Sequence, residues 1–147
     1  MCLTEVSTET FKPQKKYYCI VVQSLGDDAY WSVYQTRINL GGWDTKKWYH
    51  ANNVPILEGE FRNERVKYIS GFHLFVSKRD AIKYFKFFMR RPNEFDDDWY
   101  RLAYCSVADI RTYGYEEFKM RKGNKTKTYS FRVIVADKRR IDKVKKI

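Results

Sequence analysis

Residues 66–90 read VKYISGFHLFVSKRDAIKYFKFFMR, and this stretch decides the fold class because a strand pattern passes directly into a helix pattern. Side chains alternate between the two faces of a strand. In residues 66–76 this alternation puts Phe72, Leu74 and Val76 on one face and His73 and Phe75 on the other. A strand with apolar groups on both faces is typical of the interior of a sheet, so the pattern predicts a central strand over 66–76.

A helix is predicted to begin directly after this strand. Ser77 is a favourable N-cap, and Asp80 follows three residues later, where a carboxylate also faces the positive end of the helix dipole. The helix should run to about Arg90, since the Arg91-Pro92 pair ends it. Its apolar stripe, at helical spacing, consists of Ala81, Ile82, Phe85, Phe88 and Met89.

Further apolar runs bounded by turn residues predict more strands, at 17–23, 30–36, 100–107 and 129–136. The first two flank a turn at residues 26–28 and are expected to pair as a hairpin. The expected fold class is α+β, a mostly antiparallel sheet of about five or six strands with one main helix packed on it. Residues 1–147 are interpreted as a single domain.

Composition narrows the class of protein. Hydrophobic residues make up 44% of the chain and aromatic residues 18%, which is typical of a folded domain. The first ten residues lack the pattern of a secretory signal, and no apolar run is long enough to span a bilayer. The three cysteines form no close pair of the kind found in small secreted scaffolds. These features predict an intracellular protein without membrane contact.

Positive charge is concentrated at the C-terminal end. Residues 119–147 contain twelve basic and two acidic residues, a net charge of +10, whereas the remaining residues carry +1. Such asymmetry indicates a nucleic acid or an acidic protein surface as the partner, although a solvated basic tail that only aids solubility is the alternative. Within this basic C-terminal segment, residues 121–128 are interpreted as a mobile polar loop between two strands.

Candidate phosphate contacts come from this segment and from the outer face of the predicted helix. They are Lys119, Arg121, Lys122, Lys125, Lys127, Arg139 and Arg140 from the segment, and Arg79, Lys83, Lys86 and Arg90 from the helix. The helical cations lie in one line, which suits a phosphate backbone but equally suits a solvated helix face. Tyr113, Tyr115 and Tyr129 are candidates for base stacking, with sheet packing as the alternative.

Motifs for catalysis and metal binding are absent from the sequence. The chain has no nucleophile elbow, Walker lysine or dinucleotide-binding glycine pattern. His50 and His73 lack a local partner at metal-ligand spacing, and the side chains of Asp96–Asp98 diverge because they are consecutive. We therefore expect no enzymatic activity, no metal and no cofactor, with His73 in a structural role.

Two resemblances concern the stretch from Ser70 to Phe85. It resembles the strand and helix of an RNA-recognition motif, although the chain lacks the earlier β-α unit of that motif. The order Arg37, Ser77, Glu117 resembles that of the functional residues of ADP-ribosyltransferases, without their usual triplet around the serine. The second resemblance implies a degenerate NAD-cleaving enzyme as an alternative function.

A broader resemblance covers most of the chain. It is carried, in order, by Met1-Cys2-Leu3, Tyr30-Trp31-Ser32-Val33-Tyr34-Gln35, Gly71-Phe72-His73, Asp80-Ala81 with Tyr84, Tyr113 and Tyr115 around Gly114, and Val135-Ala136. In these residues the chain is similar to a family of small bacteriophage and prophage proteins with no settled activity, from which it departs in its long basic ending. The resemblance implies a phage-encoded accessory protein, located in the host cytoplasm or in the virion.

Together these observations predict a non-enzymatic binding protein whose basic segment contacts nucleic acid or an acidic partner. The alternative is a minor virion component, or an inhibitor that docks on a host or phage protein. In that case Trp43, Trp48 and Tyr49 are the candidate partner-binding residues, because Trp and Tyr anchors dominate protein interfaces. No sequence feature indicates an oligomeric state.

Overall fold

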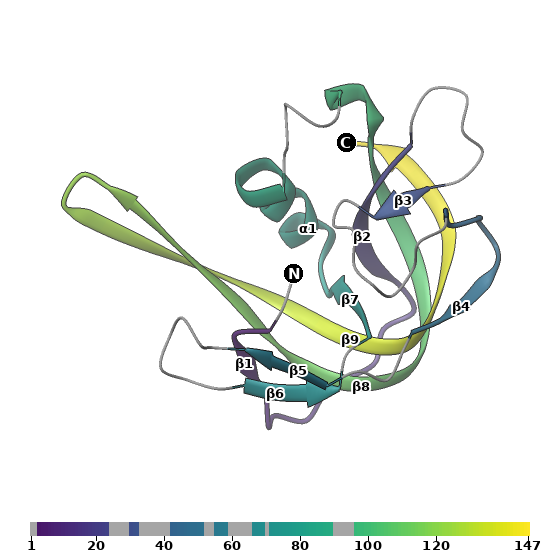
Figure 1. Cartoon of the computed structure of the whole chain (residues 1–147), viewed down its shortest axis with the longest axis horizontal. Helices are drawn as coiled ribbons and strands as arrows, with labels where there is room; N and C mark the ends of the chain where they lie inside the picture. Colours follow the sequence, from purple (N-terminus) through teal and green to yellow (C-terminus); the bar gives the residue numbers. More distant parts are fainter. Residues whose placement is uncertain are drawn as a thin grey trace.

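The computed structural model describes residues 3–23, 30–32, 42–51, 55–58, 66–69, 71–89 and 96–147. These residues form a mostly antiparallel sheet with one α-helix (Figure 1). The strands are β1 (Glu5–Val6), β2 (Tyr17–Val22), β3 (Trp31–Ser32), β4 (Trp48–His50), β5 (Pro55–Glu58), β6 (Val66–Ile69), β7 (Phe72–Phe75), β8 (Tyr100–Lys122) and β9 (Lys125–Lys146). The helices are α1 (Lys78–Tyr84), a π-helical turn (Phe85–Met89) and a 3-10 turn (Asp97–Trp99).

The long β8–β9 hairpin organises the sheet. Its two strands pair from Arg101↔Lys146 to Lys122↔Lys125. β2 pairs with the first part of β8, β7 pairs with β9 over residues 133–136, and Tyr18↔Phe75 joins β2 to β7. The pairings β8–β2–β7–β9–β8 therefore close into a ring of strands. β7 has a paired strand on each side, β2 and β9, and is thus the central strand that the sequence predicts.

The remaining strands are short. β1, β3 and β4 add to β8, β2 and β9 respectively, and β5 and β6 form a separate two-stranded sheet. The antiparallel pairing of β2 with β3 confirms the predicted hairpin for residues 31–32, while the rest of the predicted 30–36 strand lies outside the described residues. The sheet is larger than predicted because strands of two or three residues are too short to show a sequence period.

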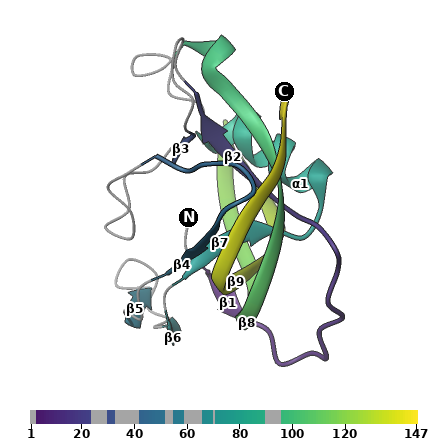
Figure 2. The ribbon, with the colours of Figure 1, turned by 90° about the vertical axis from the view of Figure 1, so that its right-hand side faces the viewer.

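Side-chain alternation produces two apolar cores on opposite faces of the sheet. The helix-side core consists of Leu3, Ile20, Val22, Tyr68, Phe75, Ala81, Tyr84, Phe85, Tyr100, Leu102, Phe131, Val133 and Val135. The opposite core consists of Tyr17, Cys19, Val21, Trp43, Ala51, Phe72, Leu74, Ala103, Cys105, Ile134, Ala136 and Ile141. Figure 2 shows α1 on one side of the hairpin and β4 towards the other.

The C-terminal segment is thus part of the fold. Residues 131–136 of β9 contribute side chains to both cores, and Ile141 is buried. The loop predicted over residues 121–128 is also corrected, because both strands continue to a two-residue turn at Gly123-Asn124. Gly123 has a φ of 59° at the first turn position, which favours glycine. The misinterpretation arose because Lys and Thr side chains on an exposed ribbon give no apolar alternation.

β-Bulges bend the hairpin. The register shifts between Tyr104 and Cys105, where Asp142 is the extra residue, and between Ile110 and Thr112, where Arg111 is the extra residue. Arg111 pairs with Asp137 at 2.6 Å, beside the second bulge. Bulges increase the local bend and twist of a strand pair, so two of them allow one hairpin to curve around β2 and β7.

The helix begins as predicted. The Ser77 side chain accepts a hydrogen bond from the Asp80 backbone N–H at 3.0 Å. The α-helix ends at Tyr84 and continues as the π-helical turn, so it is shorter than the predicted run to Arg90, which lies outside the described residues. Tyr84, absent from the predicted stripe, is buried and donates a hydrogen bond to Glu116 Oε1 at 3.1 Å, which ties α1 to the hairpin.

The strand predicted over 66–76 is two strands in two sheets. β6 pairs with β5, whereas β7 pairs with β9. Gly71 separates them at a close approach to β9, since a Cβ there would lie 2.6 Å from the Ala136 carbonyl oxygen. The alternating sequence pattern continues from β6 into β7, so the pattern could not reveal that the strand is interrupted at Gly71.

No helix in the described part of the chain is long and apolar enough to cross a membrane.

Replacing Gly71 by Ala should separate β7 from β9, because the new Cβ meets backbone that cannot rotate away. We expect the free energy of unfolding to fall by about 1–3 kcal/mol, together with faster amide hydrogen exchange in Phe72–Phe75. The matched control is Gly123→Ala, which meets nothing within 4 Å and strains only the left-handed turn. It should accelerate exchange at the hairpin turn alone. Equal protection of the β7 amides from exchange in both variants would contradict the role given to Gly71 in the contact between β7 and β9.

Candidate functional site

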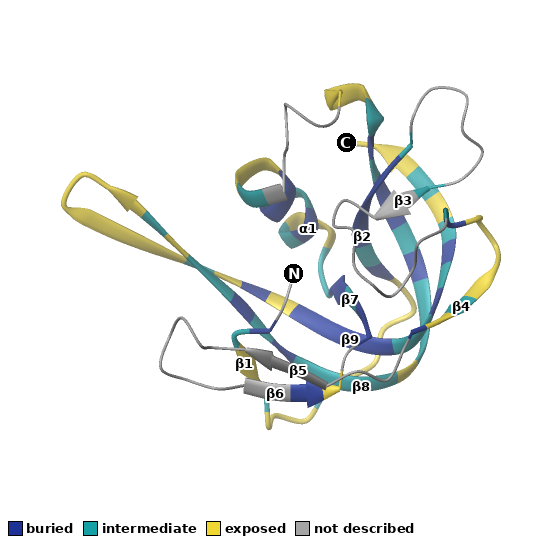
Figure 3. Cartoon of the chain, viewed as in Figure 1, coloured by how far each residue is buried: buried dark blue, intermediate teal, exposed yellow. Residues whose placement is uncertain are grey.

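The end of the β8–β9 hairpin projects beyond the two cores (Figure 1). Residues 121–128 are all exposed, and the projecting part is the largest continuous exposed stretch of the hairpin in Figure 3. We call residues 119–128 the basic hairpin. It carries five cations and no acidic residue, namely Lys119, Arg121, Lys122, Lys125 and Lys127.

Register divides these cations between two faces. Directly paired residues of an antiparallel ribbon share a face. Lys122↔Lys125 and Met120↔Lys127 therefore lie on one face, and the pair Phe118↔Tyr129 continues it towards the cores. Lys119 and Arg121, opposite Thr128 and Thr126, lie on the other face. The basic hairpin thus presents positive charge on both sides.

One face meets the end of the helical segment in an aromatic and basic group. Phe87 stacks on Tyr129 with ring centroids 5.7 Å apart and an interplanar angle of 25°. Lys83 Nζ lies 4.8 Å and Lys127 Nζ 5.1 Å from the Tyr129 ring centroid. Phe87 is 51% exposed. We call Lys83, Phe87, Lys127 and Tyr129 the Tyr129 cluster.

The Tyr129 cluster lies next to further packed aromatic rings. Phe88 stacks on Phe118 with centroids 4.2 Å apart, and Phe118 packs edge-on against Tyr84. Pre-organised aromatic surfaces lose little conformational entropy on binding. An exposed ring beside lysine ammonium groups can therefore stack on a planar ligand while the cations bind nearby anions.

The structure brings only some of the predicted phosphate contacts together. Lys83 joins Lys127 at the Tyr129 ring, and Arg79 and Lys86 are exposed on the helical segment. Arg90 lies outside the described residues. Arg139 is 7% exposed and Arg140 is paired with Asp142, so neither is kept as a phosphate contact.

Phe87 was missed by sequence reasoning. It falls outside the apolar stripe of the helix, and an apolar residue on the polar side is the signal that could have identified it. Of the other stacking candidates, Tyr113 packs on Phe11 with centroids 4.9 Å apart and burial raises its pKa. Tyr113 and Tyr115 pack near each other with centroids 6.0 Å apart.

The predicted partner-binding aromatics lie near one another but differ in burial. Trp43 is 3% exposed and packs edge-on against Tyr49 and Phe72, so it belongs to the opposite core. Tyr49 is half-buried. Trp48 is 40% exposed, with the Arg140 guanidinium 5.1 Å from its ring. Of these three aromatics, Trp48 is therefore the exposed one.

A buried group of two thiols and one guanidinium lies in the opposite core. The Sγ atoms of Cys19 and Cys105 are 3.7 Å apart, and Arg139 Nη1 lies 3.7 Å from Cys19 Sγ. The hydrogen bond from Cys105 lowers the pKa of Cys19, burial opposes this, and the charge of Arg139 lowers it further, to about 7. Burial raises the pKa of Cys105 well above its ordinary value.

Aromatic rings enclose Arg139. Its guanidinium lies 4.5 Å from the ring centroids of both Trp43 and Phe72, while its Nε and Nη2 atoms have no hydrogen-bond partner in the described part of the protein. No group of three or more potential metal ligands occurs among the described residues. His73, whose Nε2 lies 2.9 Å from the Tyr68 hydroxyl, is part of the packing, and burial lowers its pKa to about 3.

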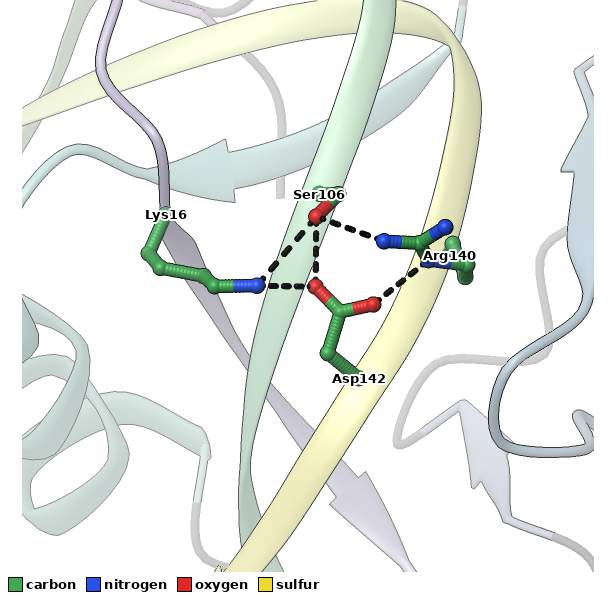
Figure 4. Close-up of polar contacts among 4 residues, drawn as sticks. All are labelled: Lys16, Ser106, Arg140 and Asp142. Atoms are coloured by element: carbon green, nitrogen blue, oxygen red, sulfur yellow. Dashed lines mark hydrogen bonds and ion pairs between the residues drawn. The ribbon is translucent and has the colours of Figure 1, made fainter.

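A polar cluster at the first bulge is paired within itself (Figure 4). Asp142 accepts hydrogen bonds from Lys16, from Ser106 Oγ at 2.5 Å and from Arg140 Nε at 2.5 Å. Burial acts to raise the pKa of Asp142, but these hydrogen bonds outweigh it and lower the pKa to about 2. The cluster joins the segment before β2 to β9 and is structural.

The chain matches no protein-family model, curated protein or solved structure. The resemblance to a phage protein family stays a prediction, as does the resemblance to ADP-ribosyltransferases. Of the residues behind the latter, Arg37 lies outside the described part of the chain, and the Ser77 hydroxyl serves as a helix cap.

Asp142 should make stability depend on pH at low pH. A depressed carboxyl pKa adds stability above the ordinary value, and this stability is lost as pH falls from about 4 to about 2. Asp142→Asn is expected to lower the free energy of unfolding at neutral pH by about 1–2 kcal/mol and to flatten its decline over that range. Urea unfolding at a series of pH values measures both effects. Asp44→Asn, an exposed control, should keep the wild-type pH profile.

Proposed function

We propose that the protein is a non-enzymatic nucleic-acid-binding protein and that the basic hairpin and the Tyr129 cluster form its contact surface. The observation that carries the proposal is the run of five exposed cations with no acidic residue among them, joined to an exposed stacked ring. A phage-encoded accessory role, in the host cytoplasm or the virion, is part of this proposal through the sequence resemblance.

Electrostatics supports a polyanionic ligand. Cations close together on a ribbon repel one another, and a phosphate backbone relieves that repulsion while it releases its own counterions. Arg121 and Lys119 on the second face add to the same field.

The Tyr129 cluster favours nucleic acid over an acidic protein. An acidic peptide satisfies lysines but does not need an exposed aromatic face, whereas nucleobases stack on such a face next to the cations that bind their phosphates. Phe87 offers that face beside Lys83 and Lys127. The alternative function is docking on an acidic protein, and the exposed Trp48 is the feature that supports it.

Removing charge from the basic hairpin should weaken nucleic-acid binding without unfolding the protein. Lys125 and Lys127 are exposed, so Lys125→Gln with Lys127→Gln leaves both cores intact. We expect about a tenfold loss of affinity for labelled oligonucleotides at about 50 mM salt, and a salt slope that is shallower by about 1.4 for single strands. Fluorescence anisotropy at about 50 and 200 mM salt measures both quantities. Truncation is no substitute, because it removes core residues of β9.

The matched control replaces two exposed lysines outside the basic hairpin, Lys12→Gln with Lys15→Gln. It removes the same charge and should reduce affinity much less. Equal losses in the two double variants would mean that net charge alone drives binding, and an unchanged affinity in the hairpin variant would refute the proposed surface. A complete lack of oligonucleotide binding by the wild type would direct the search to an acidic protein.

A further inference from the structure

A second aromatic and basic group lies near the other end of the hairpin. Tyr104 of β8 is half-exposed, and three lysine ammonium groups surround its ring. Lys143 Nζ is 4.9 Å, Lys145 Nζ 5.7 Å and Lys78 Nζ 5.8 Å from the ring centroid. Tyr18 packs against it edge-on, with centroids 5.3 Å apart. We call Tyr104, Lys78, Lys143 and Lys145 the Tyr104 cluster.

The Tyr104 cluster has the same composition as the Tyr129 cluster and lies on the same face of the sheet. Tyr104 and Tyr129 both pack against the helix-side core. Each ring has one lysine from the helix, Lys78 or Lys83, and one or more lysines from β9. The neighbouring lysines, Lys78 first, lower the pKa of Tyr104.

Helix α1 connects the two clusters. Lys78 at its first residue reaches Tyr104, and Lys83 near its end reaches Tyr129. At about 1.5 Å per residue the two lysines are separated by only about 7.5 Å along the helix axis. Successive residues of an α-helix are rotated by about 100°, so Lys78 and Lys83 point about 140° apart, towards opposite flanks of α1.

Basic side chains also occupy the outer surface between these flanks. Arg79 is exposed one residue after Lys78, and Lys86 is exposed in the following π-helical turn. Asp80 is the acidic residue of α1 and is placed in its first turn. Asp142, the acidic residue of β9 next to Lys143, is already neutralised by Lys16 and Arg140. Basic side chains therefore lie on both flanks and on the outer surface of α1, with Asp80 as the acidic residue among them.

We propose that the Tyr104 cluster is a second contact site for single-stranded nucleic acid, and that one strand runs from the basic hairpin across the outer face of α1 to the C-terminal end of β9. This inference rests on the proposed function. It adds the class of nucleic acid and the course of the strand. A single strand is the fitting ligand because stacking on a protein ring needs unpaired bases, whereas a duplex keeps its bases stacked on one another.

Oligonucleotide length separates the two sites. Single-stranded sites span about 4–16 nucleotides, so an oligothymidine of about 4 nucleotides should occupy one cluster and one of about 15 nucleotides both. Lys143→Gln with Lys145→Gln is expected to weaken binding of the longer strand about tenfold, and to make its salt slope shallower by about 1.4. The affinity for the short strand should fall much less, because the Tyr129 cluster remains intact.

Stacking by Tyr104 has its own test. Tyr104→Ser removes the ring and should weaken binding of the longer strand several-fold, whereas Tyr104→Phe keeps the ring and should bind like the wild type. Circular dichroism verifies that each variant folds. Both Tyr104 variants change the phenol hydroxyl, so a loss confined to Tyr104→Ser belongs to the ring and not to a polar contact of the Tyr104 hydroxyl.

The outcomes distinguish the two proposals. If Lys125→Gln with Lys127→Gln weakens binding while the Lys143 and Lys145 variant binds the longer strand like the wild type, the second site is refuted and the proposed function stands. If neither variant differs from Lys12→Gln with Lys15→Gln, both proposals fail. Tighter binding of a duplex than of the longer single strand would also overturn the inferred course of the strand.

Discussion

Backbone pairing between β8 and β9 is the constraint on which the rest of this structure depends. The two strands pair from Arg101↔Lys146 to Lys122↔Lys125, and β2 and β7 complete the sheet by adding to their outer edges. Because neighbouring side chains on a strand point to opposite faces, this single register assigns residues to the helix-side core, to the opposite core and to the exposed ribbon. A shift of one residue would exchange all of these positions.

The same hairpin combines the most charged part of the chain with some of its most buried residues. Val133, Ile134, Val135 and Ala136 are fully buried in β9, although the segment from residue 119 onward carries a charge of +10. Charged and buried residues can share one strand because they occupy different parts of it. Most cations lie near the two ends of the hairpin, and the buried apolar residues lie between them. Where charge falls in the curved middle, ion pairs such as Arg111 with Asp137 compensate it.

Arg139 is the exception to this compensation. It is buried between Trp43 and Phe72 and approaches the thiol of Cys19, while two of its nitrogen atoms lack a hydrogen-bond partner in the described part of the protein. A buried guanidinium costs free energy unless its surroundings stabilise the charge. Two aromatic faces and a thiol of lowered pKa provide part of that stabilisation. The remaining cations of β9 stay near solvent, where they can meet a ligand.

Some features of the protein followed from its sequence alone, because they depend on neighbours in the chain. The Ser77 cap, the start of α1, the alternation of Phe72, Leu74 and Phe75, and the concentration of charge beyond residue 118 are local patterns. Tertiary structure decided the rest. Gly71 separates two sheets because it approaches Ala136, and Arg139 is buried because Trp43, which precedes β4, and Phe72 of β7 pack on its guanidinium. The clusters around Tyr129 and Tyr104 likewise join lysines from the helix to rings from the hairpin, and contacts across such long sequence separations leave no periodic pattern along the chain.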